Sequence, residues 1–83
     1  MSEQPPRLQL LGRAGCHLCE VAAETLIRIA TEAGLVTQEI DVDTDPELQA
    51  EYGDRVPVVL LDGQEHSYFT VDVERLRRDL GLT

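Results

Sequence analysis

The chain has 83 residues and a formal net charge of −9, with sixteen acidic residues, seven arginines and no lysine. Its length allows one small domain, and its hydrophobic fraction of 42% is that of an ordinary globular protein rather than of a disordered chain. The excess of negative charge argues against nucleic acid and anionic membranes as partners. Seven acidic residues lie between Glu39 and Asp54 with no basic residue among them, which is typical of a solvated surface or of one that attracts a basic protein.

The first six residues, Met1 to Pro6, predict a short disordered lead rather than a targeting segment. They lack the basic and apolar regions of a signal peptide, and no apolar run in the chain approaches the ~20 residues of a membrane span. We therefore expect one domain over residues 1–83 that acts as a monomer in the cytoplasm. Thiols are kept reduced in that compartment, so a cysteine pair there indicates redox chemistry or metal binding rather than a permanent crosslink.

The first half of the chain predicts a strand, a helix and a second strand. Leu8, Leu10 and Leu11 form an apolar strand that ends at Gly12. Helical spacing of apolar residues then runs from residue 18 to residue 33, at Leu18, Val21, Ala22, Leu26, Ile29, Ala30 and Ala33. Gly34 supplies the helix stop. Residues 36–42 predict a strand whose polar alternates indicate an exposed side or a sheet edge.

The second half predicts a short helix, a hairpin and a last helix. The short helix begins either at a capping box formed by Thr44 and Glu47 or at an N-cap Asp45 followed by Pro46, and it ends near Gly53. The apolar run 58–61 is typical of a central strand, and Asp62-Gly63 predicts a tight turn into a strand over 65–71. The last helix begins after Thr70 or Asp72, ends at Gly81, and is expected to bury Val73, Leu76 and Leu80.

This order of elements, β-α-β-α-β-β-α, predicts an α/β fold with a four-stranded mixed sheet. The first β-α-β unit requires a parallel pair of strands, and the hairpin requires an antiparallel pair. We expect helices on both faces of the sheet.

Cys16 and Cys19 are the only cysteines of the chain, and they stand one helical turn apart. Sulfurs at positions i and i+3 of a helix can reach each other and close a readily reopened disulfide. That bridge encloses a very short loop and restricts the unfolded chain little. Stabilisation of the fold is therefore a poor explanation for the pair.

The position of Cys16 at the start of the predicted helix favours its thiolate. Free backbone N–H groups and the positive end of the helix dipole meet there. Arg13 and a protonated His17 would add positive charge, so we predict a lowered pKa for Cys16 and a less exposed Cys19. These differences predict a mechanism of two steps. The Cys16 thiolate attacks a substrate disulfide and forms a mixed disulfide, and Cys19 then attacks Cys16 and releases the reduced product.

A strand, the Cys16–Cys19 turn opening a helix, and a later Val56-Pro57 opening an apolar strand together resemble the glutaredoxin branch of the thioredoxin fold, over roughly residues 7–81. The resemblance implies a three-layer sandwich and a dithiol oxidoreductase whose cofactor is its own disulfide. It places Arg13 as the basic residue before the motif and implies a cis Val56–Pro57 bond that serves as a substrate platform. It also implies a disulfide-containing protein, or a low-molecular-weight thiol such as glutathione, as the reaction partner.

Three segments depart from the glutaredoxin pattern. His17-Leu18 stands where Pro-Tyr is common, and Arg55 replaces the usual threonine before Val-Pro, where it could bind a substrate carboxylate or form a surface salt bridge. Phe69 and Thr70, followed by a valine, replace a Gly-Gly pair and could crowd the place where glutaredoxins hold part of glutathione. We expect Phe69 and Thr70 at the substrate site.

Two rival functions stay open at this point. One is a binding module that kept the fold and uses the groove near Pro57 to hold a partner, and the other is metal or iron–sulfur handling. A structural zinc site needs about four ligands, and the chain offers two cysteines with His17 and His66. We therefore predict no metal site, and we expect His66 to be an exposed strand residue.

Overall fold

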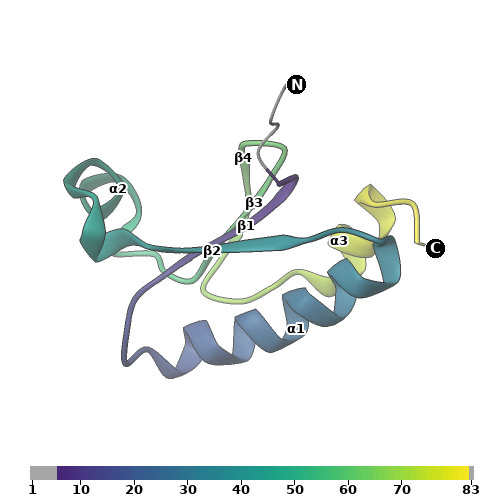
Figure 1. Cartoon of the computed structure of the whole chain (residues 1–83), viewed down its shortest axis with the longest axis horizontal. Coiled ribbons are helices and arrows are strands. Elements are labelled where there is room, and N and C mark those ends of the chain that lie inside the picture. The colour runs from purple at the N-terminus through teal and green to yellow at the C-terminus, as the bar shows by residue number, and fades with distance from the viewer. Residues whose placement is uncertain (1–5, 83) are drawn as a thin grey trace.

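A four-stranded mixed sheet forms the centre of the computed structural model, which describes residues 6–82 (Figure 1). In chain order the elements are β1 (Leu8–Gly12), α1 (His17–Ala33), β2 (Thr37–Asp41), the 3-10 helix η1 (Val42–Thr44), α2 (Pro46–Tyr52), β3 (Val58–Leu61), β4 (Gln64–Tyr68) and α3 (Val73–Asp79). The strand order is β2-β1-β3-β4, with β1 parallel to β2 and the other neighbours antiparallel. The predicted order is confirmed, whereas the expected disordered lead lies outside the described residues apart from Pro6.

Helices cover both faces of the sheet, as predicted. Figure 1 shows α1 and α3 together on one side and α2 away from them. Successive residues of β1 point to opposite faces, so Leu10 packs under α1 and α3 while Leu11 packs under α2. The α1–α3 core contains Leu8, Leu10, Ala22, Leu26, Ile29, Ala30, Val59 and Leu76, and the α2 core contains Leu11, Val42, Val58 and Leu60.

Side-chain caps fix where the helices begin. The Asp45 carboxylate accepts the N–H groups of Glu47 and Leu48, and Pro46 occupies the first turn of α2. Of the two predicted starts of α2, the Asp45–Pro46 start is therefore the one that forms. In the same way, the Asp72 carboxylate accepts the Arg75 N–H at the start of α3.

The hairpin between β3 and β4 forms as predicted, but β4 is shorter than expected. Asp62 and Gly63 both have positive φ values, 52° and 83°, as a two-residue type I′ turn requires. The strand predicted to reach Val71 ends at Tyr68, because Phe69 adopts a φ of 68° and turns the chain toward α3. The predicted end of the second strand is also wrong, since Val42 begins η1.

His66 is buried rather than exposed, which contradicts the prediction. Val59 pairs with Ser67 and Leu60 pairs with Glu65, so His66 is an extra residue in β4 and forms a bulge. The bulge breaks the alternation of faces, and the imidazole lies 2.8 Å from the Asp79 carboxylate of α3. Arg75 donates to the backbone carbonyl of His66 as well, so β4 and α3 are joined by polar contacts.

Three apolar positions that helical spacing assigned to the core are exposed instead. Leu18 and Val21 of α1 keep 51% and 47% of their surface, and Val73 of α3 keeps 40%. They lie at the ends of α1 and α3 that meet the loop after β4, and they line a surface groove with that loop. No helix within residues 6–82 has both the length and the apolar composition needed to cross a membrane.

Candidate active site

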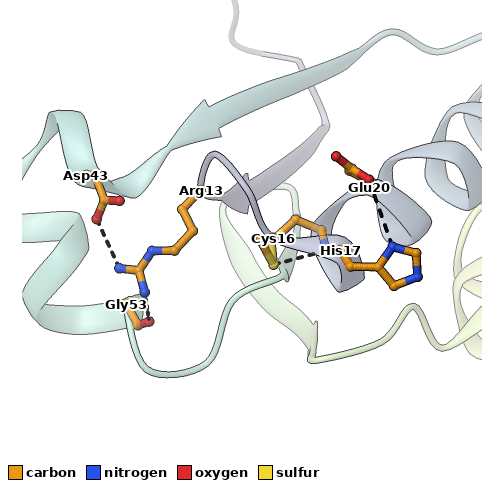
Figure 2. Close-up of a disulfide and its surroundings, with 7 residues drawn as sticks. Arg13, Cys16, His17, Glu20, Asp43 and Gly53 are labelled. Atoms are coloured by element: carbon orange, nitrogen blue, oxygen red, sulfur yellow. Dashed lines mark hydrogen bonds and ion pairs between the residues drawn. A yellow bond between two sulfur atoms is a disulfide. The ribbon is translucent and has the colours of Figure 1, made fainter.

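Cys16 and Cys19 form a disulfide at the start of α1, with their Cα atoms 5.2 Å apart (Figure 2). Cys16 is the N-cap of α1: its backbone is extended, its C=O accepts the Glu20 N–H at 3.2 Å, and its Sγ accepts the Cys19 N–H at 3.2 Å. The Cys16 sulfur therefore takes the role that a serine or aspartate oxygen plays at most helix starts. This contact favours negative charge on the sulfur.

The two sulfurs differ in accessibility, as predicted. Cys19 keeps only 8% of its surface, whereas Cys16 is half-buried. Gly12 at the end of β1 packs against Cys19 so closely that a Cβ there would lie 3.2 Å from the Cys19 Sγ. Cys16 is therefore the more exposed residue of the pair, and Cys19 lies against the end of β1. Gly12 was not predicted to be a site residue. Its position between the first strand and the Cys16–Cys19 turn was the sequence feature that could have indicated this contact.

Arg13 contacts the second half of the chain rather than the sulfurs. Its guanidinium donates to the Asp43 carboxylate at 2.9 Å and to the Gly53 carbonyl at 3.3 Å. Figure 2 shows the side chain pointing away from the disulfide toward these groups. Arg13 therefore connects the segment before Cys16 to η1 and to the C-terminal end of α2, and the Asp43 carboxylate balances its charge.

His17 also points away from the disulfide. Its side chain is 86% exposed, and its Nδ1 lies 3.9 Å from the Glu20 carboxylate. In Figure 2 the ring lies on the opposite side of the helix start from the Cys16 sulfur. Arg13 and His17, which were predicted to add positive charge at Cys16, thus each have an acidic neighbour of their own. The N-terminal end of α1 provides the positive potential at the Cys16 sulfur.

The strand register brings the Val56–Pro57 pair next to the disulfide. Leu11 of β1 is opposite Val58 of β3 in the last pair of this register, and Gly12 and Pro57 are the residues that adjoin this pair in the sequence. Gly12 in turn contacts Cys19. The Val56–Pro57 bond is cis, as the resemblance implied, and Pro57 is fully buried. The Pro57 carbonyl accepts the Phe69 N–H at 2.8 Å, which holds the loop after β4 against this corner.

Arg55 forms the surface salt bridge that was one of its two expected roles. Its guanidinium lies 3.2 Å from the Glu65 carboxylate and donates to the Glu51 carbonyl at 3.0 Å. It also lies 5.5 Å from the centre of the Tyr52 ring, a distance at which a cation and an aromatic face attract each other. The side chain is thus held by groups of its own chain.

Comparison with known proteins identifies the family of this chain. The model of the Glutaredoxin-like domain (DUF836) matches residues 7–81. This protein belongs to that family. The uncharacterized protein Rv0508 of Mycobacterium tuberculosis is 51% identical over 80 residues, covering 90% of this chain and 82% of its own.

Solved structures show the same architecture. The solution structure of protein Ne2328 from Nitrosomonas europaea has a TM-score of 0.76 at 29% identity, over 95% of this chain and 98% of that one. The thioredoxin-like protein BC3987 has a TM-score of 0.63 over 93% of this chain and 97% of that one. Its identity of 20% shows a shared fold alone. This glutaredoxin-like domain therefore has the thioredoxin fold.

This glutaredoxin-like domain has two hollows lined by residues next to the cysteine motif in the sequence. One, of about 330 Å³, reaches Cys19 and is lined by the acidic residues Glu20, Glu39 and Asp41 as well as by Arg13. The other, of about 200 Å³, is largely apolar and contains the predicted substrate residues Phe69 and Thr70. The predicted site residues are thus divided among the disulfide, the corner at Pro57 and the apolar hollow, while Arg55 is bonded to Glu65.

The ion pair between Arg13 and Asp43 is expected to lower the pH at which the Asp43 carboxyl titrates. The hydrogen bond from Arg13 lowers the pKa of Asp43 below its ordinary value of 3.8. A carboxyl group whose pKa is lower in the folded state stabilises the fold above its unfolded pKa, and this contribution is lost as the pH falls through the folded pKa. In a carbon-13 NMR titration we expect the Asp43 midpoint below 3.8, and a higher midpoint in Arg13→Gln. An unchanged midpoint in the variant would contradict this ion pair.

Proposed function

We propose that this protein is a thiol–disulfide oxidoreductase in which Cys16 is the nucleophile and Cys19 is the resolving thiol. The observation that carries the proposal is the Cys16 Sγ at the N-cap of α1, where it accepts the Cys19 N–H at 3.2 Å. A group that accepts a backbone N–H at the positive end of a helix is stabilised as an anion, and the thiolate is the reactive form of cysteine. The different exposure of the two sulfurs supports the assignment of roles.

The reaction consists of two exchanges at sulfur. The Cys16 thiolate attacks one sulfur of the substrate disulfide, so that a Cys16–substrate bond forms and the other substrate sulfur leaves as a thiolate. Cys19 then loses its proton to solvent and attacks Cys16, which forms the Cys16–Cys19 disulfide and releases the second substrate thiolate. The substrate gains two electrons and the protein loses two. Two equivalents of a low-molecular-weight thiol, or one dithiol, return the protein to its reduced form by the reverse exchanges.

The corner at Val56 and Pro57 is the proposed platform for the substrate chain. Val56 lies just before β3, whose first residue Val58 is opposite Leu11, and the next residue of β1, Gly12, packs against Cys19. A polypeptide that approaches Cys16 can therefore bind along the Val56 backbone by strand-like hydrogen bonds. Phe69 supports this corner through its N–H, which donates to the Pro57 carbonyl.

Alkylation of Cys16 as a function of pH tests the electrostatic basis of the proposal. In reduced Cys19→Ser, Cys16 is the only thiol, so the rate of reaction with iodoacetamide follows its thiolate fraction. We expect the midpoint of this rate profile to lie below the ~8.5 of an unperturbed cysteine. A midpoint at or above that value would overturn the proposed activation of Cys16.

A further inference from the structure

We infer that the substrate is a polypeptide disulfide whose reacting cysteine is next to a large apolar side chain in a basic segment, rather than a small anionic disulfide such as that of glutathione. The inference rests on the proposed function and specifies its substrate class. Three observations carry it: an apolar groove lined by Leu18, the residue before Cys19, a bulky aromatic residue in an unfavourable backbone conformation on the wall of that groove, and the pairing of Arg13 and Arg55 with acidic residues.

The apolar groove, of about 200 Å³, lies between the first turns of α1 and the loop that leads into α3. Its lining includes Leu18, which precedes Cys19 in the sequence, together with Val21 and Val73. These side chains keep 40–51% of their surface exposed, so folding leaves a contiguous apolar area uncovered. The volume is below the ~300 Å³ at which pockets for complete drug-sized ligands begin. It therefore suits one apolar side chain of a larger partner.

Phe69 forms the opposite wall of this groove. Its φ of 68° lies in the left-handed region, which is unfavourable for a bulky residue and natural for glycine. The ring is nevertheless 46% exposed, so burial in the core does not explain it. Strained residues of this kind concentrate at binding sites. A phenylalanine placed here supplies apolar surface to a partner bound beside the disulfide.

The arginines near the disulfide are already bonded to carboxylates of the same chain. Arg13 pairs with Asp43, and Arg55 pairs with Glu65. Glutathione carries carboxylates at both ends, and in the described part of the chain neither of these arginines is free to bind them. The larger hollow, which reaches Cys19, is lined by Glu20, Glu39 and Asp41. With a net charge of −9, the protein attracts a basic segment and repels an anionic one.

A series of peptides tests this substrate class. Two arginine-containing peptides, each with one cysteine as a disulfide with cysteamine, differ only in a leucine or a serine after the cysteine, and glutathione disulfide is the third substrate. We expect kcat/KM about tenfold higher for the leucine peptide than for the serine peptide, as one apolar contact provides. We expect glutathione disulfide to react more slowly than either peptide. Added salt should lower kcat/KM for both peptides, because screening weakens the attraction of unlike charges.

Val21→Ser and Ile27→Ser provide a matched pair of variants. Both residues lie on α1 and keep similar exposed surface, 47% and 49%, but only Val21 lines the groove. Val21→Ser should reduce the leucine-to-serine ratio to about 2, from the loss of part of that contact, whereas Ile27→Ser should leave it at about ten. Phe69→Gly, which suits the positive φ, should also reduce the ratio while the fold is retained.

Binding measured apart from turnover separates the two proposals. Cys16→Ser is titrated with the leucine and serine peptides while NMR follows the amides of the groove. Tighter binding of the leucine peptide supports the inference even if no substrate is turned over, and that absence of turnover would overturn the proposed function alone. Equal binding of the two peptides, a preference for glutathione disulfide, or an equal loss of the ratio in Ile27→Ser would overturn the inference.

Discussion

Cys16→Ser is expected to reduce turnover of a disulfide substrate by at least about a thousandfold, because the hydroxyl is neither ionised at neutral pH nor able to form the mixed disulfide. The loss should come from chemistry rather than from unfolding. Serine is among the preferred N-cap residues, so its oxygen can accept the Cys19 N–H that the sulfur accepts now. The assay follows loss of substrate disulfide by purified reduced protein, and circular dichroism of the same sample checks the fold.

Cys19→Ser is the matched control for that variant, because it removes a sulfur but leaves the nucleophile. Cys16 should still attack, and without a resolving thiol the mixed disulfide should accumulate at one substrate per protein. Mass spectrometry of the intact protein would detect this adduct, which a thiol reagent should release. If Cys16→Ser were as active as the parent, or if Cys19→Ser formed no adduct with the substrate, the assigned roles would be wrong.

Leu26→Ala is expected to lower the free energy of unfolding by about 2–5 kcal/mol. Leu26 is completely buried between α1 and the sheet, where it belongs to the same cluster as Leu10 and Leu76. Truncation removes apolar contacts and leaves a cavity that a close-packed core fills only in part. Because small domains have total stabilities of about 5–15 kcal/mol, this one change would remove a large share of the stability.

Ile27→Ala gives the comparison for this second prediction. The neighbouring residue has a similar side chain on the same helix, but 49% of its surface is exposed. Its truncation should change the free energy of unfolding by less than about 0.5 kcal/mol. Urea denaturation of the oxidised proteins measures both. Equal losses in the two variants would mean that α1 does not pack through the Leu26 side.

The main architecture was predictable because local patterns and fold-level rules agree. The apolar run 58–61 became β3, and the Asp62-Gly63 turn fixed the hairpin. Helical spacing of apolar residues located α1 to within one residue at its start. Connection rules then required one parallel pair and one antiparallel pair of strands.

The predictions that failed depend on contacts between elements. A single extra residue in β4 turns His66 inward toward Asp79, and alternation along the strand cannot reveal a bulge. Helical spacing placed Leu18 and Val21 in the core, and this prediction is wrong, since both are exposed. They line a groove with the loop after β4 and Val73 of α3, and this groove stays open to solvent.

The candidate site was likewise predictable only in part. The spacing of Cys16 and Cys19 specified the disulfide, since one helical turn determines their separation. The partners of the two arginines were not predictable, because Arg13 meets Asp43 thirty residues away in the sequence and Arg55 meets Glu65 ten residues away. The number of acidic residues nearby gave no indication of which carboxylate would pair with which guanidinium.

The Cys19 N–H donates directly to the sulfur whose chemical state changes during the proposed cycle. Its proton resonance should therefore move in a characteristic way as that sulfur passes from thiol to thiolate to disulfide, because the charge of the acceptor alters the shielding of the donor. The Cys19 amide signal thus reports both the oxidation state and the ionisation state of the Cys16 sulfur. It needs no attached dye or engineered probe, and it can be followed in intact protein during a reaction.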